Sequence, residues 1–236
     1  MRNAFLLFLA IGLLVIRVHA DTPSKPTAHQ HREIEGWQVD VDQRLLEGPQ
    51  AELGAQALKL LRNRLEEIAM IVPRDKVAWL RKVPIQLDAT HGGLHTMQYH
   101  PSAAWLKANG YDEALAKKVH IPDAADFSNP RHHHTQPWCV LHELAHAYHD
   151  QVLGFDNPEV MAAWKAFVDS GKYTKTRYIN GGTQRHYALT DQKEFFAEMT
   201  EAYFGTNDFF PFNRADLRDS EPAIFALMKK IWGDAP

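Results

Sequence analysis

The sequence contains very little cysteine: Cys139 is the single one among 236 residues. One cysteine cannot form an internal disulfide, so a hydrophobic core must hold the fold together. Hydrophobic residues make up 45% of the chain and charged residues 23%, a balance that is typical of globular proteins and excludes collagen-like, coiled-coil and disordered chains. A chain of this length can bury one substantial core without disulfides.

The sequence also lacks internal repeats and an excess of basic residues. Lys and Arg together number 26 against 29 Asp and Glu, which gives a formal net charge of −3. Proteins that bind nucleic acid usually present a basic surface, so we expect no nucleic acid among the partners. The composition leaves the oligomeric state open.

The first 20 residues have the features of a secretory signal peptide. Arg2 precedes an apolar run from Ala4 to Ile16, and Val18-His19-Ala20 forms a small-residue cleavage site. The apolar run is too short to span a bilayer, so no integral membrane segment is expected after cleavage. We therefore predict a secreted or periplasmic protein. The alternative is an uncleaved N-terminal anchor.

Residues 21–33 are rich in Pro, Thr, Ser and His and have almost no apolar side chains, which predicts a flexible leader. We expect the folded domain to cover residues 34–236, with an N-terminal α/β part (34–130) and a helical part (131–236). In the first part, apolar spacing predicts strands within 34–41, 83–87 and 94–99 and helices over 51–72 and 102–109.

The second part is expected to be mainly helical. Pro and Gly signals bracket apolar residues at a helical period, and residues 170–188 between them are polar and irregular. Strands gathered in the first half and helices in the second predict an α+β fold. The predicted helices of this part cover 137–153, 158–169, 191–204 and 222–232.

The strongest chemical signal is the HExxH motif His142-Glu143-Leu144-Ala145-His146, in the middle of a predicted helix. A spacing of four places His142 and His146 on one helix face, one turn apart, where both imidazoles can bind a single cation. Zinc sites in enzymes use three protein ligands and keep a fourth position open. The motif therefore predicts a metal site that needs a third ligand from elsewhere.

Glu194 is the best candidate for this third ligand. It lies in Glu194-Phe195-Phe196-Ala197-Glu198, where aromatic residues flank the carboxylate. Glu198 follows one turn later on the same face and is expected to accept the free N–H of a ligating imidazole, which would fix the tautomer. The alternative is a solvated acidic helix face made of Glu194, Glu198 and Glu201.

Together these elements resemble the catalytic domain of the anthrax lethal factor-like zinc peptidases, a gluzincin group that includes the Pro-Pro endopeptidases. The similarity rests on the HExxH, on the Glu-Phe-Phe-Ala-Glu segment and on Tyr187, seven residues before Glu194. It covers about residues 136–204, and nothing upstream of Pro130 matches. The resemblance implies a zincin-like catalytic domain with an HExxH helix, a small mixed sheet, a helical C-terminal portion and one Zn²⁺ per chain.

The resemblance implies a role for each matching residue: His142, His146 and Glu194 bind zinc, Glu143 is the general base, and Tyr187 is an electrophilic acid. The chemistry of the residues gives the same roles. Glu143 sits beside a ligand but on another part of the helix surface, where it can take a proton from water. Tyr187 leads into the Glu194 helix and can donate a hydrogen bond to an oxyanion. Its alternative role is packing.

Four other features carry weaker expectations. The strand predicted over 94–99 is either the edge strand that pairs with an extended peptide or an ordinary core strand. The run His132-His133-His134 is expected to be a polar loop rather than a second metal site. His149, one turn after His146, either lies near the site or, as the simpler expectation, is partly exposed, and Cys139 is expected to be a small buried hydrophobic residue without a lowered pKa.

The sequence as a whole predicts a secreted zinc-dependent endopeptidase that acts on a peptide or protein substrate. One alternative is a zinc amidase that acts on cell-wall peptides, because the same metal chemistry serves other amides. The other is a non-catalytic exported protein with a structural metal. The presence of Glu143 and of three rather than four predicted ligands disfavours that second alternative.

Overall fold

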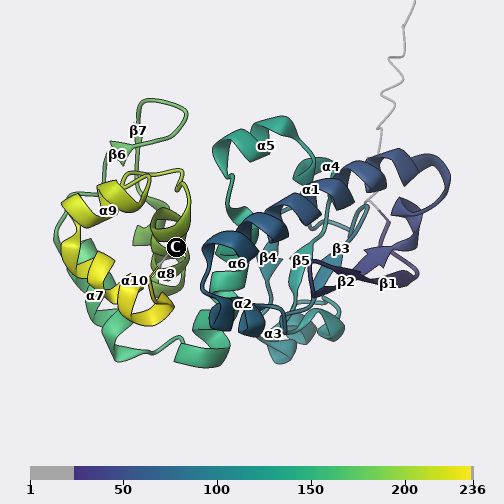
Figure 1. Cartoon of the computed structure of the whole chain (residues 1–236). Helices are drawn as coiled ribbons and strands as arrows, with labels where there is room; N and C mark the ends of the chain where they lie inside the picture. The colour runs from purple at the N-terminus through teal and green to yellow at the C-terminus, as the bar shows by residue number, and fades with distance from the viewer. Residues whose placement is uncertain (1–23, 235–236) are drawn as a thin grey trace, which may run out of the picture.

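The structure is a computed structural model and describes residues 24–234. The signal peptide predicted over residues 1–20 and the start of the predicted leader (21–23) lie outside the described residues. The described chain joins a five-stranded mixed sheet in its first half to a mainly helical second half, which confirms the α+β expectation (Figure 1). Within residues 24–234, no helix combines the length and apolarity needed to cross a membrane.

The sheet has the strand order β1-β2-β3-β5-β4. Its three central strands are parallel to one another, and β1 and β4 run antiparallel at the two edges. β4 therefore lies at an edge of the sheet, as one of the two alternatives for this segment requires, although only two residues of it are extended. The strands cover His29–Ile34 (β1), Trp37–Asp42 (β2), Ile85–Leu87 (β3), Gln98–Tyr99 (β4) and Val119–Ile121 (β5).

The predicted flexible leader is wrong for residues 29–33, because β1 begins at His29 and pairs with β2 along its whole length. Glu35 and Gly36 make the turn, both with positive φ, as a tight hairpin of this hand requires. The first five side chains of β1 are exposed. Backbone pairing rather than apolar burial holds this strand, so hydrophobic spacing gave no sign of it.

Helix α1 (Ala51–Ile71) confirms the prediction over 51–72 and buries one face, including Leu61, Leu65 and Ile68. Helix α3 (Ala103–Ala108) is also as expected, with the Ser102 hydroxyl capping its first turn. Short elements that the periodicity did not predict complete this half: α2 (Arg74–Leu80), α4 (Ala124–Phe127), α5 (Pro130–Thr135) and the 3₁₀ turns η1 (Gln43–Leu45), η2 (Gly48–Gln50) and η3 (Glu113–Leu115).

All four helices predicted for the second half are present. They are α6 (Cys139–Tyr148), which continues as a π-helical turn η4 (His149–Leu153), α7 (Pro158–Asp169), α8 (Gln192–Phe204) and α10 (Pro222–Trp232). Gly154 ends the first of these with a φ of 80°. The sequence did not predict α9 (Arg214–Ser220), the hairpin of β6 (Thr176–Arg177) and β7 (Thr183–Gln184), or the turn η5 (Tyr187–Leu189).

Helix α8 is the centre of the second half. Nine consecutive residues, Phe195–Tyr203, are buried, so the helix has no solvated face over that length. It packs against α6, α7, α9 and α10, and Figure 1 shows α6 between this helical group and the sheet. The buried indole of Trp232 in α10 packs against α8: it stacks on Phe196 and donates its N–H to Thr200 Oγ1 at 3.1 Å.

Gly205 ends α8 against Trp138, the residue that precedes α6. A Cβ atom on Gly205 would lie 2.1 Å from an indole carbon of Trp138. We expect Gly205→Ala to lower the free energy of unfolding by about 1–3 kcal/mol, the usual cost of overpacking a close contact. Urea unfolding measures this change.

Gly93→Ala is the matched control, because a Cβ there meets nothing within 4 Å and its φ is not in the left-handed region. The control should change the free energy of unfolding by less than about 0.5 kcal/mol. Equal stability of the two variants would mean that the Trp138 contact does not constrain the end of α8.

Candidate metal centre

Helix α6 places both histidines of the HExxH on one face. Val140, Leu141, Leu144 and Ala145 are buried in the core, so the opposite face faces the cavity. On that face the imidazole centroids of His142 and His146 are 4.7 Å apart, with ring planes at 82°. Each side chain is only 12% exposed. As the sequence predicted, the spacing of four residues places both imidazoles on one face of α6, where they can bind a single cation.

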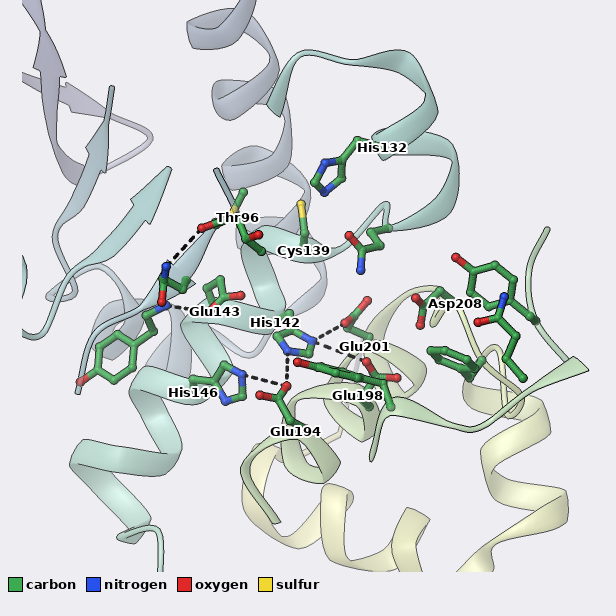
Figure 2. A pocket seen from close by; sticks show the side chains of 18 residues that line it. Thr96, His132, Cys139, His142, Glu143, His146, Glu194, Glu198, Glu201 and Asp208 are labelled. Carbon is green, nitrogen blue, oxygen red and sulfur yellow. Dashed lines mark hydrogen bonds and ion pairs between the residues drawn. The ribbon is translucent and has the colours of Figure 1, made fainter. Parts of the chain in front are cut away.

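Glu194 reaches the two imidazoles from the first turn of α8. Asp191 caps that turn, because its carboxylate accepts the N–H groups of Lys193 and Glu194. Glu194 Oε2 lies 3.1 Å from His142 Nε2 and 3.4 Å from His146 Nε2 (Figure 2). Burial opposes ionisation, but hydrogen bonds with the two imidazoles outweigh it and hold the pKa of Glu194 well below its usual range.

The donor set fits a divalent transition metal. One atom from each of His142, His146 and Glu194 lies within 4.8 Å of the other two. Tetrahedral zinc with ligand bonds near 2.0–2.1 Å separates its ligands by about 3.3 Å, close to the two distances observed. Two further groups in the described part of the chain could also hold a cation: Asp88, His91 and His120, and His142 with Glu198 and Glu201.

Glu143 lies beside the triad and is held by the edge strand. The backbone N–H of Tyr99 in β4 donates to Glu143 Oε2 at 2.7 Å. Burial raises the pKa of Glu143 above its ordinary value. The carboxylate is therefore oriented by the sheet rather than by its own helix, and it shares the cavity with His142 and His146.

Tyr187 also lines this cavity, from the turn η5 just before α8. Its side chain is half exposed, so the ring stands at the cavity wall rather than in the core. Burial and the nearby charge of Glu194 raise the pKa of its phenol, which keeps the hydroxyl protonated as a donor. The structure thus brings all five predicted metal and catalytic residues to one cavity.

The predicted partner of the imidazole N–H is corrected by the structure. Glu201 Oε1 lies 2.6 Å from His142 Nδ1, whereas Glu198 Oε1 lies 4.0 Å away. Both carboxylates lie on the α8 face of Glu194, four and seven residues along. The sequence spacing allows either one, and the tilt of α8 against α6 decides which side chain reaches the ring. This contact favours the His142 tautomer with its proton on Nδ1, which leaves Nε2 free on the side of Glu194.

The cavity around the triad has a volume of about 550 Å³. One side is bordered by β4, and the other carries the carboxylates of Glu198, Glu201 and Asp208 (Figure 2). Burial, followed by the charge of Glu201, raises the pKa of Asp208 to about 7. The sequence pattern gave no sign of Asp208, and it placed Glu201 only on a possible solvated helix face. Asp208 follows α8 in an irregular segment, and no motif marks it.

Expectations for the remaining histidines and the cysteine had mixed outcomes. His132, His133 and His134 lie in helix α5 rather than in a loop, and only His132 lines the cavity. His149 is fully buried between Phe155 and Phe196, so the predicted partial exposure is wrong; this burial lowers its pKa to about 4. Cys139 borders the cavity and is only partly buried, so the expected burial is not complete; the pKa of its thiol is raised to about 12, which agrees with the expectation of no lowered pKa.

Comparison with family models, with curated proteins and with solved structures finds no match to this chain.

The hydrogen bond from His142 to Glu201 gives a direct test of the corrected partner. We expect Glu201→Gln to weaken metal affinity about 10–100-fold, because the amide is a poorer acceptor for the Nδ1–H group. Competition with a chromogenic chelator measures the affinity. Glu198→Gln is the matched control on the same helix face and should change the affinity much less. A larger loss in the control would restore Glu198 as the partner.

Proposed function

We propose that this chain is a zinc-dependent endopeptidase with a zincin-like domain of the gluzincin type. One observation carries the proposal: the two histidines of the HExxH in α6 and Glu194 from α8 converge at the wall of an open cavity, and Glu143 lies beside them. The resemblance to the anthrax lethal factor-like peptidases assigns the same residues. The predicted signal peptide supports secretion or export to the periplasm.

His142, His146 and Glu194 would hold the zinc through Nε2, Nε2 and a carboxylate oxygen. Bound zinc supplies a Lewis acid that polarises the scissile carbonyl and lowers the pKa of water to about 7. Three protein ligands leave room for substrate, which favours a catalytic over a structural site. Having three protein ligands rather than four therefore disfavours the alternative of a non-catalytic protein with a structural metal.

Glu143 is the general base of the proposed reaction. Its carboxylate faces the same cavity as the triad and is one residue from His142, so it can accept the proton of the attacking water. The same carboxyl group then returns this proton to the leaving amine. The N–H of Tyr99 on Oε2 keeps the side chain oriented and leaves the other oxygen for the proton.

Tyr187 is the proposed electrophilic acid and lines the same cavity from the turn η5. Its phenol is protonated and half exposed in the cavity, so it can donate to the oxyanion that develops as the carbonyl carbon becomes tetrahedral. A donor in a confined site contributes to catalysis because it stabilises charge that exists only in the transition state.

The edge strand favours a peptide over other amides. Thr96, Met97, Gln98 and Tyr99 border the cavity, and β4 has no strand on its outer side within the described sheet. An extended peptide can pair with such an edge through main-chain hydrogen bonds while its side chains vary. An amidase acting on cell-wall peptides would use the same metal residues but needs no such edge.

The base is tested by replacing Glu143 with Gln. We expect E143Q to bind zinc as the wild type does and to lose hydrolysis of a mixed peptide library by at least about 100-fold. Mass spectrometry of the library and of the metal content gives both readouts. Glu194→Ala is the contrasting variant, and it should lose the zinc itself.

Retained hydrolysis in E143Q would overturn the mechanism, and full zinc content in the Glu194 variant would remove that residue from the ligand set. Chelator-sensitive cleavage of cell-wall peptides, with no cleavage of the library, would favour the amidase.

The role of Tyr187 is tested by its conservative variant. We expect Tyr187→Phe to lower kcat about 100–1000-fold with little change in KM, because the lost hydroxyl acts in the transition state. Zinc content and thermal stability should stay at wild-type values. Tyr178→Phe, at the same cavity, is a matched control. An unchanged kcat in Y187F would leave Tyr187 with a packing role.

A further inference from the structure

A second cluster of metal-ligating side chains lies inside the sheet half of the molecule. Asp88 directly follows β3, His91 lies in the turn after it, and His120 is in the middle of β5. Their relative exposures are 0%, 4% and 0%. None of the three lines the cavity of the HExxH site. The cluster is therefore separate from that site.

The three side chains meet at one carboxylate oxygen. His91 Nδ1 lies 2.6 Å and His120 Nε2 lies 2.8 Å from Asp88 Oδ2. The two imidazoles are arranged like the pair in the HExxH: their centroids are 4.7 Å apart with ring planes at 80°, against 4.7 Å and 82° for His142 and His146. His91 and His120 both approach Asp88 Oδ2, just as His142 and His146 both approach Glu194 Oε2.

The surroundings have the pattern of a second ligand shell. His29 Nε2, from β1, is 2.7 Å from Asp88 Oδ1, and His100 Nε2 is 3.3 Å from His120 Nδ1. Residues that ligate a metal are normally held in this way through their remaining polar atom. Gln86 Nε2 adds a third nitrogen, 3.0 Å from Oδ2. Three nitrogens therefore approach an oxygen that has two lone pairs.

The charge of the cluster also calls for a cation. The side chain of Asp88 is completely buried, and its polar side-chain contacts are three histidines and Gln86, with no Lys or Arg among them. A buried carboxylate needs a compensating charge, which a bound cation would supply.

We propose that Asp88, His91 and His120 bind a second divalent transition metal of the zinc class. The ligand atoms are Oδ2, Nδ1 and Nε2, which lie within 4.8 Å of one another. Imidazole and carboxylate ligands suit zinc better than calcium or magnesium. Water would complete the coordination, while His29 holds Asp88 through Oδ1. This site needs no catalytic role, and it does not depend on the function proposed for the first site.

The second metal would tie together the strands that support the cleft. It links the end of β3 to β5, and Gln98 in the edge strand β4 pairs with His120 in β5. The turn that carries His91 leads into β4, whose Tyr99 N–H holds Glu143. Loss of this metal should therefore loosen β4 and leave the helical half folded.

The test counts metal ions in the full folded chain, prepared with Zn²⁺ and then dialysed, by inductively coupled plasma mass spectrometry. We expect two zinc ions per chain in the wild type, one in His146→Ala, one in His91→Ala and none in the double variant. His95→Ala is the matched control, because His95 is in the same turn but exposed and contacts Asp123 instead. It should retain two.

One zinc ion in the wild type that His146→Ala removes would overturn the second site and leave the proposed peptidase intact. Two ions that His91→Ala does not reduce would overturn it as well. Conversely, an ion that only His91→Ala removes would support the second site and count against the first. If His91→Ala fails to fold, His120→Asn replaces it, and wild-type circular dichroism is required of whichever variant is counted.

Discussion

The packing of α8 against α6 is the contact on which the candidate metal centre depends. His142 and Glu194 are 52 positions apart in the chain and come within 3.1 Å only because these helices touch. The residues of α8 from Phe195 to Tyr203 are all buried, so the helix can neither rotate nor slide without opening the core. The rigid apolar packing around α8 therefore sets the position of the Glu194 carboxylate.

Burying α8 so fully also places polar side chains where water cannot reach them, and each requires a compensating contact. Thr200 bonds to the Phe196 carbonyl and receives the Trp232 indole N–H, while Glu201 pairs with His142. Burial, with the nearby charge of Asp208, raises the pKa of Glu198 well above its ordinary value. A divalent cation at the triad would reduce the cost of keeping such carboxylates ionised.

The sheet connects the two candidate metal sites through a single strand pair. Tyr99 of β4 holds Glu143 at the first site, and the adjacent Gln98 pairs with His120 at the second. The edge position of β4 matters at both sites, because one side of the strand pairs with β5 while the Tyr99 N–H bonds to the Glu143 carboxylate instead of to another strand. A shift in the register of this pair would disturb both sites together.

The sequence by itself determined what depends on near neighbours: the long periodic helices such as α1, α7 and α10, and the convergence of His142 and His146, which one helical turn guarantees. It missed β1 and β5, because a polar edge strand and a three-residue buried strand carry no periodic signal. Only the tertiary structure decided that Glu201 rather than Glu198 supports His142, and that Asp88, His91 and His120 meet. Those distances follow from how helices tilt and strands pair, which local spacing does not encode.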